Sequence, residues 1–244
     1  MMVRYGIVVD LTRCTGCMTC VLACKEENFT PPGEYWIKVS ELQGTDPPIY
    51  MPMLCVHCDN PPCVDACPKN AIIKRPDGIV IIDQNKCVVE CGRCVEACPY
   101  GVIALHPDAK YFPETPIPYE RNMAEHRIHK PGLAGKCTMC VHRVDQGLEP
   151  ACVSGCPAGA LIFGDLDDPN SAISKIAWKS EQLQAELGTK PKVTFITPPE
   201  VSLAAVPITM TVTMTQTVTK TKLPTLRLET QKLVDRAGFE PATS

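Results

Sequence analysis

The sequence has few of the residues that usually build a protein core. Aromatic residues make up only 5% of its 244 residues, and hydrophobic residues of all kinds, cysteine included, make up 45%. A conventional core of aromatic and aliphatic side chains is therefore thin for a chain of this length. Something besides side-chain packing has to hold the fold together.

Long apolar runs are also missing. The first residues contain a single apolar run of four, residues 6–9, whereas a secretory signal needs about 7–15. No stretch reaches the roughly 18 apolar residues of a membrane span. We therefore expect no signal peptide and no membrane span in this chain, although a protein can cross a membrane attached to a partner that carries a signal.

Basic residues are not in excess either. Lys and Arg number 24 against 27 Asp and Glu, for a formal net charge of -3, and no basic cluster alternates with aromatic residues. A nucleic-acid partner is therefore not expected. No Ser/His/Asp set, phosphate-binding loop or paired-carboxylate site stands out. The sequence predicts no catalytic residues, and substrate chemistry is expected on another chain.

Cysteine, in contrast, is abundant, and its pattern is regular. All sixteen cysteines fall into four quartets with none left over. The quartets are Cys14, Cys17, Cys20 and Cys24; Cys55, Cys58, Cys63 and Cys67; Cys87, Cys91, Cys94 and Cys98; and Cys137, Cys140, Cys152 and Cys156. Such a number permits a disulfide scaffold, zinc sites or iron–sulfur clusters. Disulfide scaffolds are usually shorter and exported, so they are the least favoured.

The spacing favours iron–sulfur clusters over zinc. A CxxCxxC loop brings three thiolates around one point, as a cubane cluster requires, whereas zinc sites usually combine two separate CxxC turns. In two-cluster ferredoxins the fourth cysteine binds the other cluster, and a proline commonly follows it. Pro68, Pro99 and Pro157 are in place here, but Lys25 replaces the proline after Cys24.

The third quartet departs from the pattern by one residue. "IVVDLTRC" before the first loop is repeated as "VIIDQNKC" before the third, but three residues rather than two separate Cys87 from Cys91. We expect Cys87 to remain a ligand, with Val88, Val89 and Glu90 forming a wider loop. The carboxylate of Glu90 then approaches the cluster and lowers its potential. The alternative is that Cys87 does not reach, which leaves a [3Fe–4S] cluster.

The coarse secondary structure is a set of short strands between the cysteine loops. Residues 71–74 and 78–83 predict a hairpin, and residues 34–42 and 47–54 predict a second one. Residues 168–187 predict a helix, with Asp168 or Asn170 as its N-cap. Residues 209–221 alternate threonine with apolar residues and fit either an edge strand or a disordered stalk.

The order and spacing of the four quartets resemble the iron–sulfur electron-transfer subunit of the dimethyl-sulfoxide-reductase family of molybdopterin oxidoreductase complexes. The likeness runs from Tyr5 to Ile196. It implies an α+β fold of two interlaced bacterial-ferredoxin-like domains, each with two [4Fe–4S] clusters, with hairpin insertions and a C-terminal helix. The family's pairing implies cluster A on Cys14, Cys17, Cys20 and Cys156; cluster B on Cys24, Cys137, Cys140 and Cys152; cluster C on Cys55, Cys58, Cys63 and Cys98; and cluster D on Cys67, Cys87, Cys91 and Cys94.

The resemblance also implies domain boundaries. Residues 1–52 and 102–188 would form a discontinuous first domain around the first and fourth quartets, and residues 53–101 the second domain. Residues 189–244 would be a Thr-rich extension that is disordered or contacts a partner. Its last residues, "RAGFEPATS", look like translated tRNA-gene sequence, and we assign them no function.

The implied function is electron relay. The subunit would pass electrons between a molybdopterin or tungstopterin catalytic subunit and a quinone-reactive membrane subunit or other redox partner. The complex would be membrane-associated, either cytoplasmic or exported with its catalytic partner. The alternatives are a free-standing polyferredoxin and a zinc-ribbon interaction module.

Some polar residues beside the cysteines invite a role. His57 and His142 could tune a cluster by hydrogen bonding, but we favour exposed loop histidines, because histidine ligation is mostly a Rieske feature. Five basic residues either offset cluster charge, contact a partner or form a solvated face: Lys25, Lys69, Lys74, Arg93 and Lys136.

Overall fold

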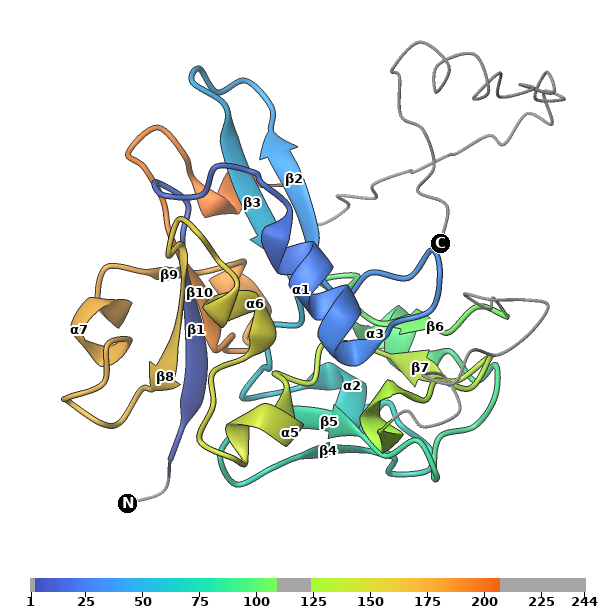
Figure 1. Ribbon diagram of the computed structural model, residues 1–244. Helices are drawn as coiled ribbons and strands as arrows, with labels where there is room; N and C mark the ends of the chain where they lie inside the picture. Colours follow the sequence, from blue (N-terminus) through green and yellow to red (C-terminus); the bar gives the residue numbers. More distant parts are fainter. Residues whose placement is uncertain (1–2, 109–123, 207–244) are drawn as a thin grey trace, which may run out of the picture. The chain divides into compact units, whose positions relative to one another are not determined.

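The computed structural model describes residues 3–108 and 124–206, and its largest sheet joins the two ends of that range. The sheet has the strand order β8-β1-β10-β9 (Figure 1). Strand β1 (Tyr5–Asp10) runs antiparallel to β8 (Leu161–Asp165) and parallel to β10 (Val193–Ile196). Ile7, Val8 and Val9 are fully buried, which explains why β1 is a continuous apolar run rather than an alternating one.

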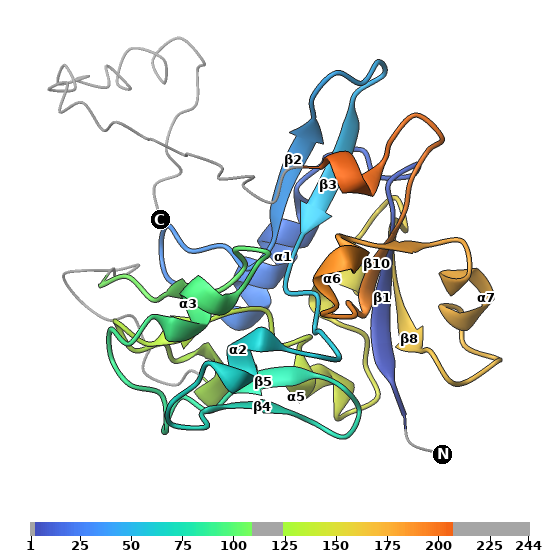
Figure 2. The ribbon, with the colours of Figure 1, turned by 180° about the vertical axis from the view of Figure 1, so that it is seen from behind.

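Two hairpins and a third two-stranded sheet separate the cysteine loops. They are β2 (Lys38–Leu42) with β3 (Ile49–Met53), β4 (Ile72–Lys74) with β5 (Val80–Ile82), and β6 (Ala104–Leu105) with β7 (Ala134–Gly135). The first two hairpins confirm the predictions from the β-branched runs. Figure 2 shows β4 and β5 beside α2 (Pro62–Asp65), which precedes them in the chain.

The helices are short, and four of the six α-helices in the described residues carry cysteines. The longest, α1 (Thr19–Asn28), contains Cys20 and Cys24 one turn apart. The others are α3 (Arg93–Ala97), α5 (Val141–Val144), α6 (Ala151–Ser154), α7 (Ser174–Ala177) and the 3-10 turns η1 (Glu125–Arg127), η2 (Ala185–Leu187) and η3 (Leu203–Ala205). None of the helices in the described ranges is long and apolar enough to span a bilayer.

The predicted C-terminal helix over residues 168–187 is confirmed for one turn only and is wrong in its extent. The only α-helix within these residues is the single turn α7, with the 3-10 turn η2 at their end. Neither Asp168 nor Asn170 caps α7, since the helix begins at Ser174 after Ile173. Strand β9 (Glu181–Gln182) follows, because the open edge of β10 offers it backbone hydrogen bonds. Gln184 then adopts φ 50°, which ends any helical continuation. Sheet pairing has overridden helix propensity.

The sheet extends beyond the boundary predicted at residue 188. Residues of β10, assigned from sequence to the C-terminal extension, pair with β1 over Ile7–Asp10. The stretch 209–221 and the final "RAGFEPATS" lie outside the described residues. The hairpins, the mixed sheet and the short helices are compatible with an α+β fold.

Candidate iron–sulfur cluster sites

Each quartet contains a tight loop with a left-handed residue at the same position. The residue directly before the second cysteine of every quartet has a left-handed backbone conformation. These residues are Gly16 at φ 68°, His57 at φ 43°, Glu90 at φ 58° and Met139 at φ 54°. A left-handed residue lets neighbouring N–H groups converge on one anion. In the fourth quartet the Met139 N–H donates to Cys137 Sγ at 3.3 Å.

The wider third loop keeps this left-handed residue. Glu90 stands directly before Cys91, as Gly16 stands before Cys17, so the extra residue is accommodated earlier in the loop. The Glu90 N–H donates to the Gly132 carbonyl at 2.7 Å, which anchors the loop from outside. The glutamate side chain itself is exposed. Its charge is therefore better screened than the sequence suggested.

The structure gathers twelve of the cysteines around three apolar hollows. One hollow is lined by Cys14, Cys17, Cys20 and Cys156; a second by Cys55, Cys58, Cys63 and Cys98; and a third by Cys67, Cys87, Cys91 and Cys94. Each group combines three cysteines of one quartet with the last cysteine of another. Cys87 lies with the other three in its hollow despite the wider loop.

The remaining four cysteines are all buried and lie close together. They are Cys24, Cys137, Cys140 and Cys152. Burial raises the pKa of Cys152 well above its usual value, and the neighbouring Cys137, Cys140 and Cys24 add to the rise. The side-chain amide of Asn28 reaches two of them, at 3.5 Å from Cys24 Sγ and 3.9 Å from Cys140 Sγ.

Burial sets the chemistry of these thiols. It raises the pKa of Cys58, Cys63 and Cys137 to about 12, so they are protonated at neutral pH in the metal-free chain. Iron binding must displace these protons, so the binding energy is coupled to folding and to pH. Sixteen free thiols in four groups of four offer an all-sulfur donor set, which suits iron–sulfur clusters. When bound, such clusters accept and donate one electron at a time.

The two histidines singled out from the sequence have different surroundings. His57 is fully buried, and its Nδ1 accepts the Val80 N–H at 3.1 Å. Burial lowers the pKa of His57 well below its usual value and keeps the ring neutral. The preference for exposed loop histidines is therefore wrong for His57. His142 is half-buried and pairs with Glu27 at 2.8 Å.

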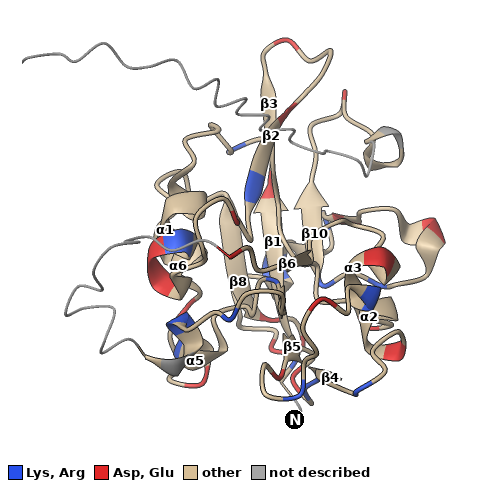
Figure 3. Ribbon diagram, turned by 90° about the vertical axis from the view of Figure 1, so that its right-hand side faces the viewer, with Lys and Arg blue, Asp and Glu red and all other residues tan. Residues whose placement is uncertain are grey.

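The basic residues singled out from the sequence also differ in their burial. Lys69, Lys74 and Arg93 are exposed, as a solvated face requires. Lys136 is buried, and its Nζ donates to the carbonyl oxygens of Val80 and Cys137. Charges of both signs mix on α1 (Figure 3), and Lys25 in its last turn donates to three carbonyl oxygens of residues 30–34.

Some residues next to the sulfurs were missed from the sequence. Asn28 lies four residues after Cys24 on the same face of α1, a spacing that could have indicated it. Thr189 bonds to Tyr100 at 2.5 Å and acts on Cys58, whose pKa its hydrogen bond lowers against the larger effect of burial. No local pattern marks Thr189, since it lies 89 residues from Tyr100.

Comparison with known proteins agrees with this chemistry. Two family models, both described as "4Fe-4S dicluster domain", match the chain, one at residues 13–71 and the other at residues 48–123 and 112–166. The matches cover all sixteen cysteines. The fold and sites therefore define a protein of the ferredoxin-like class that binds [4Fe–4S] clusters in pairs.

Named relatives identify the family within this class. The chain is 42% identical to a Halobacterium salinarum protein assigned as an iron–sulfur subunit of dimethyl sulfoxide reductase, over 80% of this chain and 79% of that protein. It is 39% identical to a subunit of the tetrathionate reductase of Salmonella typhimurium, covering 79% and 72%. It is 37% identical to the arsenate respiratory reductase iron–sulfur subunit of a Shewanella strain, covering 79% and 96%.

The chain belongs to the family of iron–sulfur electron-transfer subunits of dimethyl-sulfoxide-reductase-type complexes. It is a non-catalytic component of an oxidoreductase complex, and this supports the subunit interpretation over the free-standing polyferredoxin.

Proposed function

We propose that the chain carries four [4Fe–4S] clusters, A to D, on the sixteen cysteines grouped above, within two interlaced domains. The observation that carries this proposal is the grouping itself. Every cysteine shares its surroundings with three others, and the groups coincide with the ligand sets that the family resemblance implies. Domain one then comprises residues 1–52 and 102–188, with β10 added to its sheet, and domain two residues 53–101.

Neighbouring clusters share a helix or a contact between their ligands, so the four clusters form an electron-transfer series in the order A, B, C, D. Clusters A and B take Cys20 and Cys24 from α1, about 6 Å apart along the helix axis. The charge of Cys55, in cluster C, adds to the burial that raises the pKa of Cys137, in cluster B. Clusters C and D share α3 and its C-cap, through Cys98 and Cys94.

Clusters A and D, at the two ends of this series, are the points where electrons enter and leave. Cys17 in cluster A and Cys91 in cluster D are exposed. The ligands of cluster B are all buried, and those of cluster C are buried except for the half-buried Cys98. Exposed clusters exchange electrons with partners, and buried ones relay them. One end therefore faces the catalytic partner and the other faces the electron donor or acceptor.

The catalytic partner is a molybdopterin or tungstopterin subunit, and a quinone-reactive membrane subunit completes the relay. Support comes from relatives named as subunits of dimethyl sulfoxide, tetrathionate and arsenate reductases. The complex is then membrane-associated through its partners, either in the cytoplasm or exported with the catalytic subunit.

Iron analysis of the anaerobically purified chain tests the cluster number. Four [4Fe–4S] clusters require about sixteen iron and sixteen sulfide per chain. About eight of each would reduce the proposal to one pair of clusters. Purification from the native host tests the partner, since a large pterin-containing protein should co-purify. A monodisperse monomer with full electron-transfer activity would favour the free-standing polyferredoxin.

A further inference from the structure

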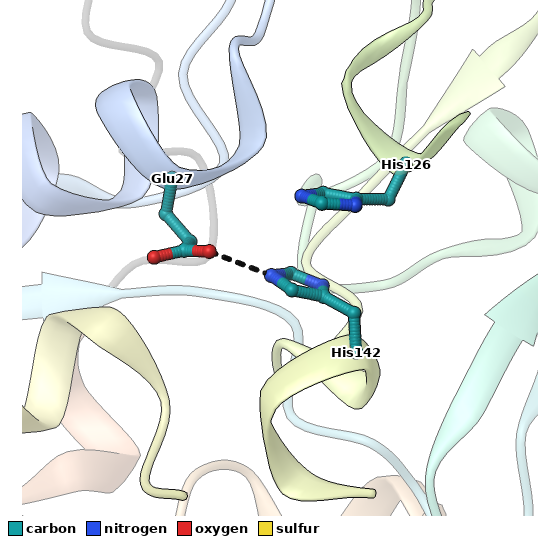
Figure 4. A group of neighbouring side chains, drawn as sticks. All are labelled: Glu27, His126 and His142. Carbon is teal, nitrogen blue, oxygen red and sulfur yellow. Dashed lines mark hydrogen bonds and ion pairs between the residues drawn. The ribbon is translucent and has the colours of Figure 1, made fainter. Parts of the chain in front are cut away.

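Three side chains with metal-binding chemistry meet outside the four cysteine groups. They are Glu27 in the last turn of α1, His126 in η1 and His142 in α5 (Figure 4). One ligand atom from each residue lies within 4.8 Å of those of the other two. A carboxylate and two imidazoles form an oxygen–nitrogen donor set, which is chemically distinct from the thiolate sites.

The geometry of the three groups suits a single ion. Glu27 Oε1 lies 2.8 Å from His142 Nε2. The His126 ring is stacked on the His142 ring at 3.7 Å, and each ring turns one nitrogen toward the side of Glu27 (Figure 4). Metal bonds of about 2.1 Å place neighbouring ligand atoms roughly 3 Å apart. An ion can therefore replace the hydrogen-bonding proton between Glu27 and His142 after a small opening of the contact and a tilt of the His126 ring.

The carboxylate is already oriented for this role. Arg143 Nη1 donates to Glu27 Oε2 at 2.9 Å and leaves Oε1 directed at His142. Metal-ligating carboxylates are commonly held by such a second hydrogen bond. The Arg143 charge opposes a cation, but it is partly exposed, at 27% of its side-chain surface, so solvent screens it.

Both imidazoles also have unsatisfied polar atoms. Nε2 of His126 and Nδ1 of His142 are buried and have no hydrogen-bond partner within the described parts of the chain. A buried nitrogen without a partner costs free energy. A bound ion would offset this cost at His126 Nε2, whereas His142 Nδ1, the ring nitrogen that does not face Glu27, would need a water. Both rings line a hollow shared with polar Asn28, Gln84 and Thr138 and with the buried Lys136, whose Nζ donates to two carbonyl oxygens. This hollow gives room for the waters that would complete the coordination.

We propose that Glu27, His126 and His142 bind one divalent transition-metal ion, for which zinc is the expected occupant. Two histidines and a glutamate are a known ligand set of zinc, with further positions left to water. The ion would link α1, η1 and α5. Two of these elements adjoin Cys24 and Cys140, so the ion would stiffen the covering of the most buried cysteine group.

Zinc binding to the cluster-loaded chain tests the proposal. The protein is dialysed anaerobically against buffered Zn²⁺, and zinc and iron are counted together. One zinc per chain is expected, with the iron content unchanged. X-ray absorption at the zinc edge should show oxygen and nitrogen ligands at about 2.0–2.1 Å and no sulfur at about 2.3 Å. Zinc with sulfur ligands, or zinc gained as iron is lost, would show binding to the cysteines and overturn the proposal.

Three variants make the test specific. Glu27→Gln and His126→Ala should each weaken zinc binding at least about tenfold, since loss of even an outer-shell partner costs about 10–100-fold. His129→Ala is the matched control, because His129 lines the same hollow but bonds to the Asn28 carbonyl at 2.8 Å instead of joining the triad. Unchanged binding in Glu27→Gln, or an equal loss in His129→Ala, would refute the site. If the His126→Ala variant loses iron, its zinc binding no longer reports on the site alone, and the result for Glu27→Gln decides the test.

Discussion

The side-chain amide of Asn28 lies 3.5 Å from the sulfur of Cys24, one helical turn earlier in α1. It also donates to the Cys24 carbonyl at 3.0 Å and lies 3.9 Å from Cys140 Sγ. One buried amide thus joins the sulfurs of two cysteines that are far apart in the sequence. An N–H group directed at sulfur favours the more negative, reduced state of a cluster.

Asn28→Leu should therefore lower the midpoint potential of cluster B. If the hydrogen bond is about 1 kcal/mol stronger in the reduced state, its loss corresponds to roughly 40 mV for one electron. Redox-titrated EPR measures the shift. Asn60→Leu is the control, since the Asn60 amide donates to the Gly188 carbonyl at an exposed position. An unchanged potential in Asn28→Leu would show that the amide does not act on the cluster.

Lys136 should raise the potentials of clusters B and C together. It is buried, and its charge lowers the pKa of both Cys63 and Cys137 against the larger effect of burial. A buried positive charge stabilises reduced clusters, so Lys136→Gln should lower both potentials by several tens of millivolts, on the order of 1–2 kcal/mol of Coulomb energy. Lys136→Arg should restore most of the difference.

Redox titration of the two EPR signals checks this prediction against an exposed lysine. Lys74 has 33% of its side chain exposed and pairs with Asp59 at 2.8 Å, so Lys74→Gln removes the same charge from a screened position. Equal shifts in Lys136→Gln and Lys74→Gln would contradict a local effect of the buried charge. A shift in the potential of only one of the two clusters would contradict the position of Lys136 between clusters B and C.

Glu34 and His106 form a buried polar link that should contribute strongly to stability. Glu34 Oε2 lies 2.5 Å from His106 Nδ1, and its Oε1 accepts the Trp36 Nε1–H at 2.7 Å. Glu34→Ala leaves two buried ring nitrogens without this partner, at a cost of about 3 kcal/mol. Urea unfolding of the cluster-loaded protein should show a midpoint about 1–2 M lower. Glu41→Ala on the exposed face of β2 should leave the midpoint unchanged.

The sequence could predict what depends on neighbours in the chain. The cysteine loops and the β4–β5 hairpin are local, because a few consecutive residues determine them. The helix predicted over residues 168–187 failed because the competing partner, β10, comes later in the chain. The link between Glu34 and His106 spans 72 residues, and the contact of Asn28 with Cys140 spans 112. No periodicity within either segment records such contacts.

Cys87 is expected to be a full cluster ligand. It shares a hollow with Cys67, Cys91 and Cys94, and the wider loop keeps a left-handed residue before Cys91. Cys87→Ser should therefore convert cluster D to a [3Fe–4S] form with about fifteen iron per chain. EPR of the oxidised protein should show the three-iron signal in the variant and not in the wild type. Identical spectra would remove Cys87 from the ligand set.

The carboxylate of Glu90 lies in the same loop as Cys87, and we expect it to have little effect on cluster D. The sequence suggests that Glu90 lowers the potential of cluster D, but its side chain is exposed and the backbone N–H, not the carboxylate, makes the anchoring contact to Gly132. Screening at an exposed position reduces such a charge effect to well under about 1 kcal/mol. Glu90→Gln should therefore shift the potential of cluster D by less than about 20 mV. A shift comparable to that of Lys136→Gln would mean that the carboxylate turns toward the cluster in the loaded protein.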